Sequence, residues 1–452
     1  MRLSIVRLLG GLAAVITALT FAVPAVAQDW LSDRARAQGP GIRVGDFELH
    51  PGIGIEAGYD SNVFFSDGSA TSAPIVSSGI LRVTPHLLFS TIGAQREAEG
   101  EARDSANASP PTVQFSGGLS ASYYAFFADE ARNNLSFDGN LNLVILPERP
   151  FTVTIHERFS RVIRPFTEQR GVGTGDGRLD FGRNENDAGV NFSFGTPGRV
   201  LSANLGYSLI YNFFDGDEFK FADSLSHRFN GGASFRFLPQ TAFIYDIEGV
   251  YRTFPSAGDS LASALLSDGF TVRTRVGING AFTNRLSLSA LVGYAAGWFD
   301  VQDDFESVVA QLELRWQASA SARFALGYDR NFTPSYIGNF MRVDRGYVNF
   351  QLMIGGSFLV GAEASLGLLD FGTPIAPDGT LLGNGERSDI RLSTSLFAEY
   401  RLTNWLGLNG TLRYTGDFTD YAYSIMDMPG STIIDPAGYS KVEAWFGVRA
   451  FY

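Results

Sequence analysis

Histidines, acidic clusters and glycine-rich stretches are the parts of this sequence that could support chemistry. The four histidines stand at positions 50, 86, 156 and 227, and no two have the His-x-x-x-His spacing that places two metal ligands together. We find neither a Gly-x-Ser-x-Gly nucleophile elbow nor a phosphate-binding loop. The sequence therefore predicts no catalytic residue, no metal ion and no cofactor, and it indicates a protein that is not an enzyme.

Two weaker patterns each have a chemical and a structural interpretation. Gly52, Gly54 and Gly58 look like part of a nucleotide-binding fingerprint, but no helix follows them, and packing on one strand face is the favoured interpretation. Acidic residues cluster over 215–218 and 303–306, where they could hold calcium at the surface. Solvated loop tips explain these clusters without a ligand, and we favour that interpretation.

The composition narrows the class of protein. The 452 residues include 35 Lys and Arg against 47 Asp and Glu, a formal net charge of −12, and no cysteine. The absence of cysteine excludes disulfides and thiolate chemistry, and the acidic balance argues against a nucleic-acid partner. Charged residues make up 18% of the chain, against about 25% in ordinary soluble proteins, and aromatic residues make up 13%. This composition favours strands embedded in a membrane.

The N-terminal segment is typical of a secretory signal. Arg2 and Arg7 precede an uncharged apolar run over 8–23. Ala25-Val26-Ala27 then forms a small-x-small cleavage site before Gln28. A retained anchor helix is the alternative, but the run is shorter than the ~20 residues that a membrane-spanning helix needs. We predict a signal peptide over 1–27, a periplasmic N-terminal segment over 28–45 and a barrel over 46–452.

Period-two alternation from residue 389 to residue 402 predicts a long β-strand. Apolar side chains fall mostly on one face, whereas arginines, serines and Glu399 fall on the other, a separation that a helix would not produce. Similar segments of about 10 residues or more recur along the chain, as tilted membrane strands require. Pro51 and Pro85 fall inside the first two of them, where we expect bulges or shorter strands. We count about eighteen strands, with 16 or 20 as alternatives, starting near Phe47, Ile80, Val113, Asn134, Phe151, Ala188, Val200, His227, Ala242, Gly269, Leu286, Ser307, Ala322, Gly346, Phe358, Asp389, Trp405 and Gly438.

These strands predict an all-β fold, a transmembrane antiparallel up-and-down β-barrel. Short turns alternate with long polar loops, the asymmetry typical of periplasmic turns and outer loops. Alternation from Val442 to the final Tyr452 resembles the assembly signal of bacterial outer-membrane proteins. We expect a location in the outer membrane of a Gram-negative bacterium, with membrane lipid, lipopolysaccharide and the barrel assembly machinery as partners.

A barrel of this width leaves a water-filled lumen unless something plugs it. Strand parity places 14 basic and 10 acidic residues along that lumen. The wall could be a mildly cationic path for an acidic or polyhydroxyl substrate, because guanidinium groups bind carboxylates through two donors. The charges could instead pair across strands and only keep the wall hydrated. The residues predicted to line a substrate path are Arg236, Arg252, Arg273, Arg275, Arg315, Arg391, Arg401, Arg413, Arg449, Glu313 and Glu399.

The stretch over 41–66 reads GIRVGDFELHPGIGIEAGYDSNVFFS. A short strand in it is followed by an apolar strand that ends in Tyr59-Asp60-Ser61-Asn62 and an apolar-aromatic pair. This pattern resembles the opening of a family of β-barrel porins that accompany exopolysaccharide clusters, with Ser61 where the family commonly has a second Asp. We expect Tyr59 at an aromatic girdle, and Asp60 and Asn62 turning the backbone at the strand exit.

The resemblance implies an outer-membrane channel that exports an exopolysaccharide or another surface polysaccharide. Periplasmic polysaccharide-export proteins would then be partners and the polysaccharide the substrate. A general or small-solute porin is the alternative, and a non-conducting structural barrel is the third interpretation.

Overall fold

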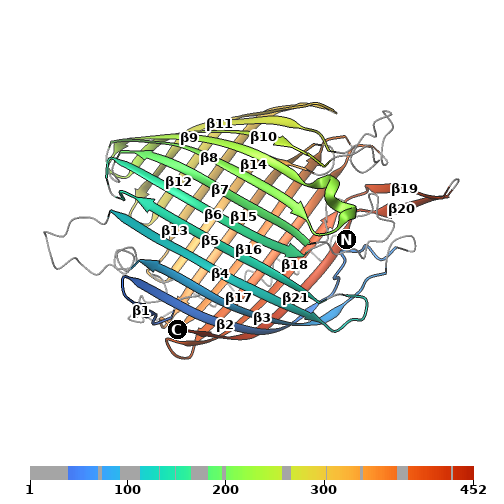
Figure 1. The fold of residues 1–452 in the computed structure, drawn as a ribbon, viewed down its shortest axis with the longest axis horizontal. Helices are drawn as coiled ribbons and strands as arrows, with labels where there is room; N and C mark the ends of the chain where they lie inside the picture. Colours follow the sequence, from blue (N-terminus) through green and yellow to red (C-terminus); the bar gives the residue numbers. More distant parts are fainter. Residues whose placement is uncertain are drawn as a thin grey trace.

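The computed structural model describes residues 39–69, 74–91, 112–131, 133–147, 149–163, 182–195, 200–256, 266–301, 303–335, 339–373, 385–428 and 431–452. This part of the chain is nearly all β-strand, and its long strands form one barrel (Figure 1). The predicted signal peptide over 1–27 lies outside the described residues. No helix within them is long and apolar enough to cross a bilayer.

Eighteen long antiparallel strands form the closed wall of the barrel in the described chain. Consecutive strands pair with each other, and the last strand pairs with β18 on one side and with β2 on the other, which closes the ring. The predicted up-and-down barrel of about 18 strands is confirmed. The strands are β2 (Phe47–Asp60), β3 (Ser78–Thr91), β4 (Val113–Phe126), β5 (Asn134–Ile145), β6 (Phe151–Ile163), β7 (Gly182–Phe194), β8 (Leu201–Phe214), β9 (Ser224–Leu238), β10 (Thr241–Thr253), β11 (Gly269–Thr283), β12 (Leu286–Phe299), β13 (Phe305–Gln317), β14 (Ala322–Pro334), β15 (Phe340–Ile354), β16 (Phe358–Phe371), β17 (Ser388–Arg401), β18 (Leu406–Phe418) and β21 (Tyr439–Phe451).

The two ends of the barrel differ in their connections. At one end, which we call the turn end, two residues join β9 to β10 and two join β11 to β12. At the opposite end, the loop end, 15 residues separate β10 from β11 and 16 separate β16 from β17. Figure 1 shows the turn end at left, beside the C-terminus, and the loop end at right. The predicted alternation of short turns and long loops is therefore present with one exception, because 21 residues separate β3 from β4 at the turn end.

Most predicted strand starts agree with the structure, but two strands begin earlier than predicted. Sixteen starts lie within three residues of the observed ones, whereas β7 and β15 each start six residues sooner. The first residues of β7 are polar on both faces, and β15 begins with apolar Met341 and Val343 on its inner face, so neither start shows the apolar-outward alternation. The Asn184 side chain donates to Asp215 Oδ1 at 2.7 Å, and Arg342 pairs with Asp370. Polar pairing thus extends both strands toward the loop end.

The two prolines inside strands do not have the predicted effect. The register of β2 with β3 runs unbroken through Pro51 and Pro85, so the expected bulges or shortened strands are wrong. Among the described pairings, Thr84 and Pro85 lack partners in β4. A proline has no amide hydrogen to donate, so the ladder skips this position while the strand stays extended.

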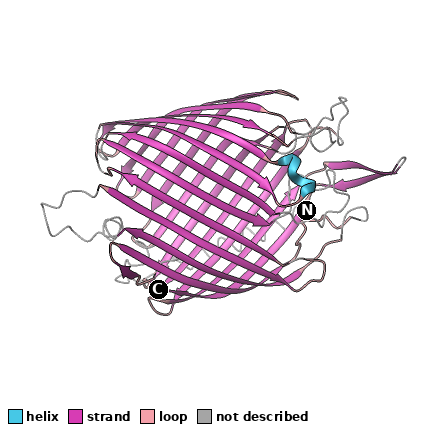
Figure 2. Cartoon of the chain, in the orientation of Figure 1, coloured by secondary structure: helices cyan, strands magenta, loops and turns pink. Residues whose placement is uncertain are grey.

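In the described residues, four short elements lie outside the eighteen-stranded wall. Strand β1 (Ile42–Val44) pairs with the start of β2, and the 3₁₀ helix η2 (Asp217–Ala222) follows β8. Strands β19 (Ala422–Met428) and β20 (Ser431–Pro436) form a hairpin that projects beyond the loop end (Figure 2).

The outer face of the wall is apolar. Large apolar side chains stay exposed at alternate positions, among them Leu205, Phe229, Val276, Leu326 and Phe446. A band of exposed apolar side chains around a closed barrel is the surface that membrane lipid covers, because closure leaves no unpaired strand edge in the hydrocarbon. The fold is a transmembrane β-barrel.

Candidate functional site

Side-chain contacts that skip a strand identify the inner face of the wall. The Arg273 guanidinium on β11 donates to Asn331 Oδ1 on β14 at 3.3 Å. The Tyr347 hydroxyl on β15 donates to Glu313 Oε2 on β13 at 2.5 Å, passing over β14. Side chains of non-adjacent strands can meet in this way only on the concave face of a curved sheet. Residues that share the parity of these side chains therefore face the lumen.

All eleven residues predicted to line the lumen lie on this inner face. The set consists of Arg236, Arg252, Arg273, Arg275, Arg315, Arg391, Arg401, Arg413, Arg449, Glu313 and Glu399. The structure also places there seven charged residues that the predicted inner set omitted, namely Arg183, Arg345, Asp60, Glu185, Asp187, Asp389 and Asp417. These additions raise 14 bases to 16 and 10 acids to 15, so the inner face is nearly neutral.

The late predicted starts of β7 and β15 explain why several of these residues were missed. Arg183, Glu185 and Asp187 precede the predicted start at 188, and Arg345 precedes the predicted start at 346. Asp389 differs, because its parity with Arg391 on the same strand could have identified it from the sequence.

Ion pairs between strands form a chain across the inner face from β7 to β11. Each arginine in it approaches an acid of a neighbouring strand, and Arg228 lies between two acids. The pairs are Arg228–Asp187 at 3.5 Å, Arg228–Glu248 at 3.9 Å, Arg273–Glu248 at 3.2 Å and Arg275–Asp246 at 3.0 Å. Arg275 also donates to Gln311 Oε1 on β13 at 3.2 Å. The second interpretation of the lumen charges, pairing across strands, thus describes much of this wall.

A second group of charges lies on β13, β14 and β15. Glu313 accepts a hydrogen bond from the Tyr347 hydroxyl at 2.5 Å and forms an ion pair with Arg315 Nε, also at 2.5 Å. Arg345 pairs with Asp329 at 2.9 Å, and its guanidinium carbon lies 5.3 Å from the Tyr347 ring centroid. The group joins three strands and leaves both arginine head groups toward the lumen.

A buried carboxylate, that of Glu56, connects the strands where β21 pairs with β2 and closes the barrel. Glu56 on β2 pairs with Arg82 at 2.5 Å and with Arg449 at 3.2 Å, and it accepts from Asn409 Nδ2 at 2.6 Å. Arg82 also lies over the Trp445 ring at 4.4 Å. Glu56 therefore connects strands β18, β21, β2 and β3 where chain closure occurs.

The loop end of β17 and β18 carries buried ion pairs. Arg387 and Asp389 are both fully buried and pair at 2.6 Å, and Arg391 pairs with Asp417 at 2.5 Å. Tyr421 lies beside this group, and burial raises the pKa of its hydroxyl to about 12, so it stays neutral at physiological pH. These pairs fasten the wall to the segments that cover it rather than facing open water.

The stretch that resembles a family opening builds the exit of β2. Tyr59 is exposed on the outer face, whereas Asp60 pairs with Lys441 of β21 at 2.6 Å and accepts from the Asn62 amide at 2.9 Å. The side chain of Asn62 donates to the carbonyls of Ser66 and Ser440, at 2.6 and 3.1 Å, and accepts from the Ser66 amide at 2.8 Å. These bonds hold the chain after β2 against the inner face.

The segment over 61–69, which we call the exit segment, packs inward at the loop end. Phe64 is buried against Val63, Val76 and Ala131. The ring of Phe65 meets that of inner-face Tyr439 at 4.9 Å, and Lys441 Nζ lies 4.2 Å from the Phe65 centroid. The exit segment therefore narrows the loop-end mouth on the side of β21, β2 and β3.

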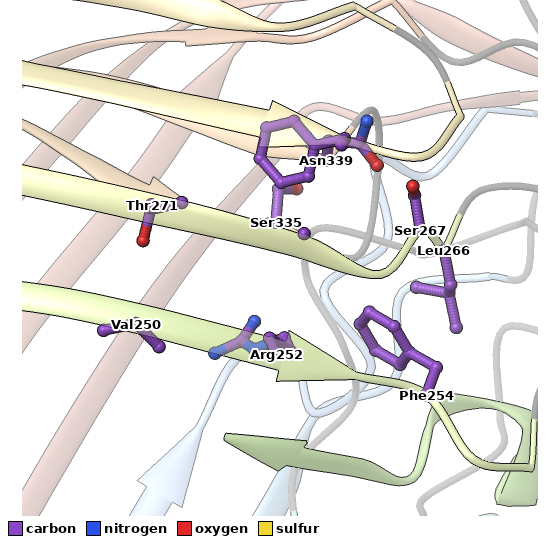
Figure 3. A pocket seen from close by; sticks show the side chains of 10 residues that line it. Val250, Arg252, Phe254, Leu266, Ser267, Thr271, Ser335 and Asn339 are labelled. Carbon is purple, nitrogen blue, oxygen red and sulfur yellow. The ribbon is translucent and has the colours of Figure 1, made fainter. Parts of the chain in front are cut away.

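A small cavity lies at the loop end beside Arg252 (Figure 3). Phe254 and Leu266 give it an apolar side, and Ser335 and Asn339 approach from the connection between β14 and β15. Its volume is about 20 Å³, enough for about one water molecule and too small for a solute. Arg252 donates to Ser226 Oγ at 3.2 Å there, so its role is local.

No metal site is evident in the part of the chain that the structure describes, because no three His, Cys, Asp or Glu side chains converge there to hold an ion. Two larger hollows line the lumen wall instead. One, of about 380 Å³, is bounded by residues that include Glu56, Arg82 and Arg449, and the other, of about 420 Å³, by residues that include Arg273 and Arg275. Polar side chains on concave surfaces of this size suit solutes that pass in water.

The fold and the lumen together define the class of this protein as a transmembrane barrel with a charged, concave inner wall. No family model matches the chain, and no curated protein matches it. Similar solved structures include OccAB4 of Acinetobacter baumannii, which is 10% identical, with 92% of this chain and 100% of that chain covered and a TM-score of 0.43. OccK11 (OpdR) of Pseudomonas aeruginosa is 11% identical, with 92% and 99% covered and a TM-score of 0.44. The FrpB iron transporter of Neisseria meningitidis is 9% identical, with 89% and 81% covered and a TM-score of 0.44. These scores lie below 0.5, so function is inferred from the barrel itself.

Proposed function

We propose that this chain is an outer-membrane porin through which small hydrophilic solutes diffuse. The observation that carries the proposal is the exposure of inner-face side chains away from the ends of their strands. Arg413 within β18 and Arg345 within β15 point inward, yet 46% and 48% of their side chains are exposed. An inward side chain can be exposed to that degree only where the lumen is wide enough to hold water around it. Water in the lumen, together with an apolar outer face, is what a passive aqueous channel requires.

The outer membrane is the proposed location because closed barrels of this type are the β-architecture of that membrane. The outer face would contact lipid and lipopolysaccharide there, and the barrel assembly machinery would insert the chain. Because short turns face the periplasm in such barrels, we place the turn end at the periplasm and the loop end outside.

Export of an exopolysaccharide rests on the resemblance of residues 41–66 alone. Two of the residues that carry the resemblance, Asp60 and Asn62, attach the exit segment to β21, and these contacts lie at the loop-end mouth. Polysaccharide export, with its periplasmic partners, therefore stays a prediction, and the small-solute porin is the function that the lumen supports better.

Conductance across a planar lipid bilayer tests the proposal. Purified full-length protein is expected to produce stable current steps in potassium chloride, and detergent without protein provides the control. Polyethylene glycols of increasing size then report the width of the lumen, because polymers that enter it lower the current. A protein that inserts as a folded barrel and carries no current would overturn the porin and leave a structural barrel. Current blocked by long acidic polysaccharides but not by small sugars would instead favour export.

A further inference from the structure

We propose that the lumen prefers anions although its charges are nearly balanced, because its arginine head groups face the water while the carboxylates that neutralise them lie against the wall. This inference rests on the proposed channel function and adds the class of solute. The preferred solutes would be small anions, such as carboxylates and phosphates, whose oxygens fit guanidinium donors.

The exposure of paired side chains shows this radial order. Arg315 is 72% exposed and its partner Glu313 14%, whereas Arg345 is 48% exposed and its partner Asp329 25%. Arg413 is 46% exposed and its partner Glu443 20%, and Arg228 is 37% exposed and its partner Asp187 9%. In each of these four pairs the positive group is the one that a passing solute meets.

The order follows from side-chain length and from hydrogen bonding. An arginine carries its charge farther from the backbone than an aspartate or a glutamate does, so the guanidinium of a wall pair extends past the carboxylate. Neighbouring donors also keep some acids close to the wall, since Glu313 accepts a hydrogen bond from Tyr347 besides its ion pair with Arg315. Coulomb attraction falls with distance and is screened by salt over about 10 Å, so the nearer charge dominates for a solute in the lumen.

The order is reversed on one part of the wall. Glu248 is 32% exposed and its partner Arg273 23%, and Asp246 is likewise more exposed than Arg275. These two pairs have the same formal charge as the pairs on β13–β15 but the opposite radial arrangement. They provide a matched control within the same molecule.

The sharpest candidate for anion contact is the pair of arginines on β13 and β15. The structure gives Arg315 an ion pair with Glu313 through Nε, and Arg345 contacts Asp329 through Nε and Nη2. Arg345 also rests over the Tyr347 ring, which limits the positions that its head group can take. A carboxylate or phosphate that passes this wall meets two guanidinium groups within three adjacent strands.

Reversal potentials in a potassium chloride gradient across a planar bilayer test the inference. The unmodified porin is expected to pass chloride more readily than potassium. A fourfold variant, Glu313→Gln with Arg315→Gln and Asp329→Asn with Arg345→Gln, leaves net charge unchanged and is expected to bring the permeability ratio toward one. The matched variant, Asp246→Asn with Glu248→Gln, Arg273→Gln and Arg275→Gln, also leaves net charge unchanged and is expected to keep or increase the chloride preference.

Each outcome of this experiment has a defined meaning once heat-modified mobility on gels shows that the variants fold. A conducting wild-type pore that is non-selective or prefers potassium would overturn the inference, as would equal reversal potentials for the wild type and the first fourfold variant. A parallel loss of chloride preference in both fourfold variants would also overturn it, because radial order would then not matter. Absence of current in the wild type would count against the porin itself, so the two proposals fail separately.

Discussion

Asn62 holds the exit segment through both ends of its side-chain amide. Its nitrogen donates to two carbonyls, one of them on β21, and its oxygen accepts from Ser66. The residue is 1% exposed, so water cannot replace these bonds without opening the segment. An asparagine suits this place because a short amide side chain both donates and accepts beside a turning backbone.

Asn62→Ala is therefore expected to loosen the exit segment without unfolding the barrel. Each buried group left without a partner costs about 1–3 kcal/mol, which exceeds what a short surface segment can absorb. We expect faster protease cleavage within 61–69 and larger current fluctuations, because this segment lies at the loop-end mouth. Asn133→Ala is the control, since Asn133 accepts one exposed hydrogen bond from the Phe126 amide. Equal cleavage rates in the two variants would show that the side chain of Asn62 does not hold the segment.

At the scale of secondary-structure elements, the contact between β13 and β15 across β14 requires a glycine on β14, Gly327. Gly327 of β14 pairs with Glu313 on one side and with Tyr347 on the other. The Tyr347 ring lies across Gly327 to reach Glu313, in the space that a Cβ at this position would occupy. The glycine is thus required for close approach rather than for backbone conformation.

Gly327→Val is expected to displace Tyr347 and break its hydrogen bond to Glu313. Overpacking of this kind costs about 1–3 kcal/mol and should lower the temperature at which the heat-modified gel mobility of the barrel changes. Gly346→Val on β15 is the matched control, because a Cβ there meets nothing within 4 Å. If both variants lose the same stability, β-strand propensity rather than the contact with Tyr347 explains the loss of the first.

The molecule as a whole is a ring whose two ends are chemically different. Apart from the connection between β3 and β4, the turn end has connections of two to six residues, whereas the loop end carries several long connections, the β19–β20 hairpin and the buried pairs around Asp389. Long connections on one side are the rule for barrels inserted with their turns toward the periplasm. The sidedness of the proposed porin can be measured directly, because the chain contains no cysteine.

Single cysteines introduced at the two ends are expected to label from opposite sides of the membrane. Asp303→Cys lies exposed at the loop end, and Ser319→Cys lies exposed in the turn between β13 and β14. A maleimide attached to a polymer too large for the lumen should modify the first in intact cells, and the second only after the membrane is opened. Labelling of Ser319→Cys alone in intact cells would reverse the orientation, and labelling of neither would contradict a surface-exposed loop end.

Strand number, strand position and inner-face identity follow from the sequence because they depend on local alternation. Arg273 and Arg275 could be placed on the inner face from their neighbours alone, since a strand turns each successive side chain to the opposite face. The same locality explains the errors. Alternation has no signal where both faces are polar, as at the start of β7. It is inverted at the start of β15, where apolar side chains face inward and polar ones outward, so Arg345 was missed.

Three properties were decided only by the tertiary structure: the contacts made where the barrel closes, the partners of the charged side chains, and how far each charged group extends into the lumen. Glu56 meets Asn409 because the ring closes, and no local pattern relates residues so far apart in the chain. The exposure of Arg315 depends on how far its head group reaches past Glu313 and on the Tyr347 bond over Gly327. Parity thus assigned most of the charges to a face, whereas curvature and packing determined which sign of charge meets the lumen water.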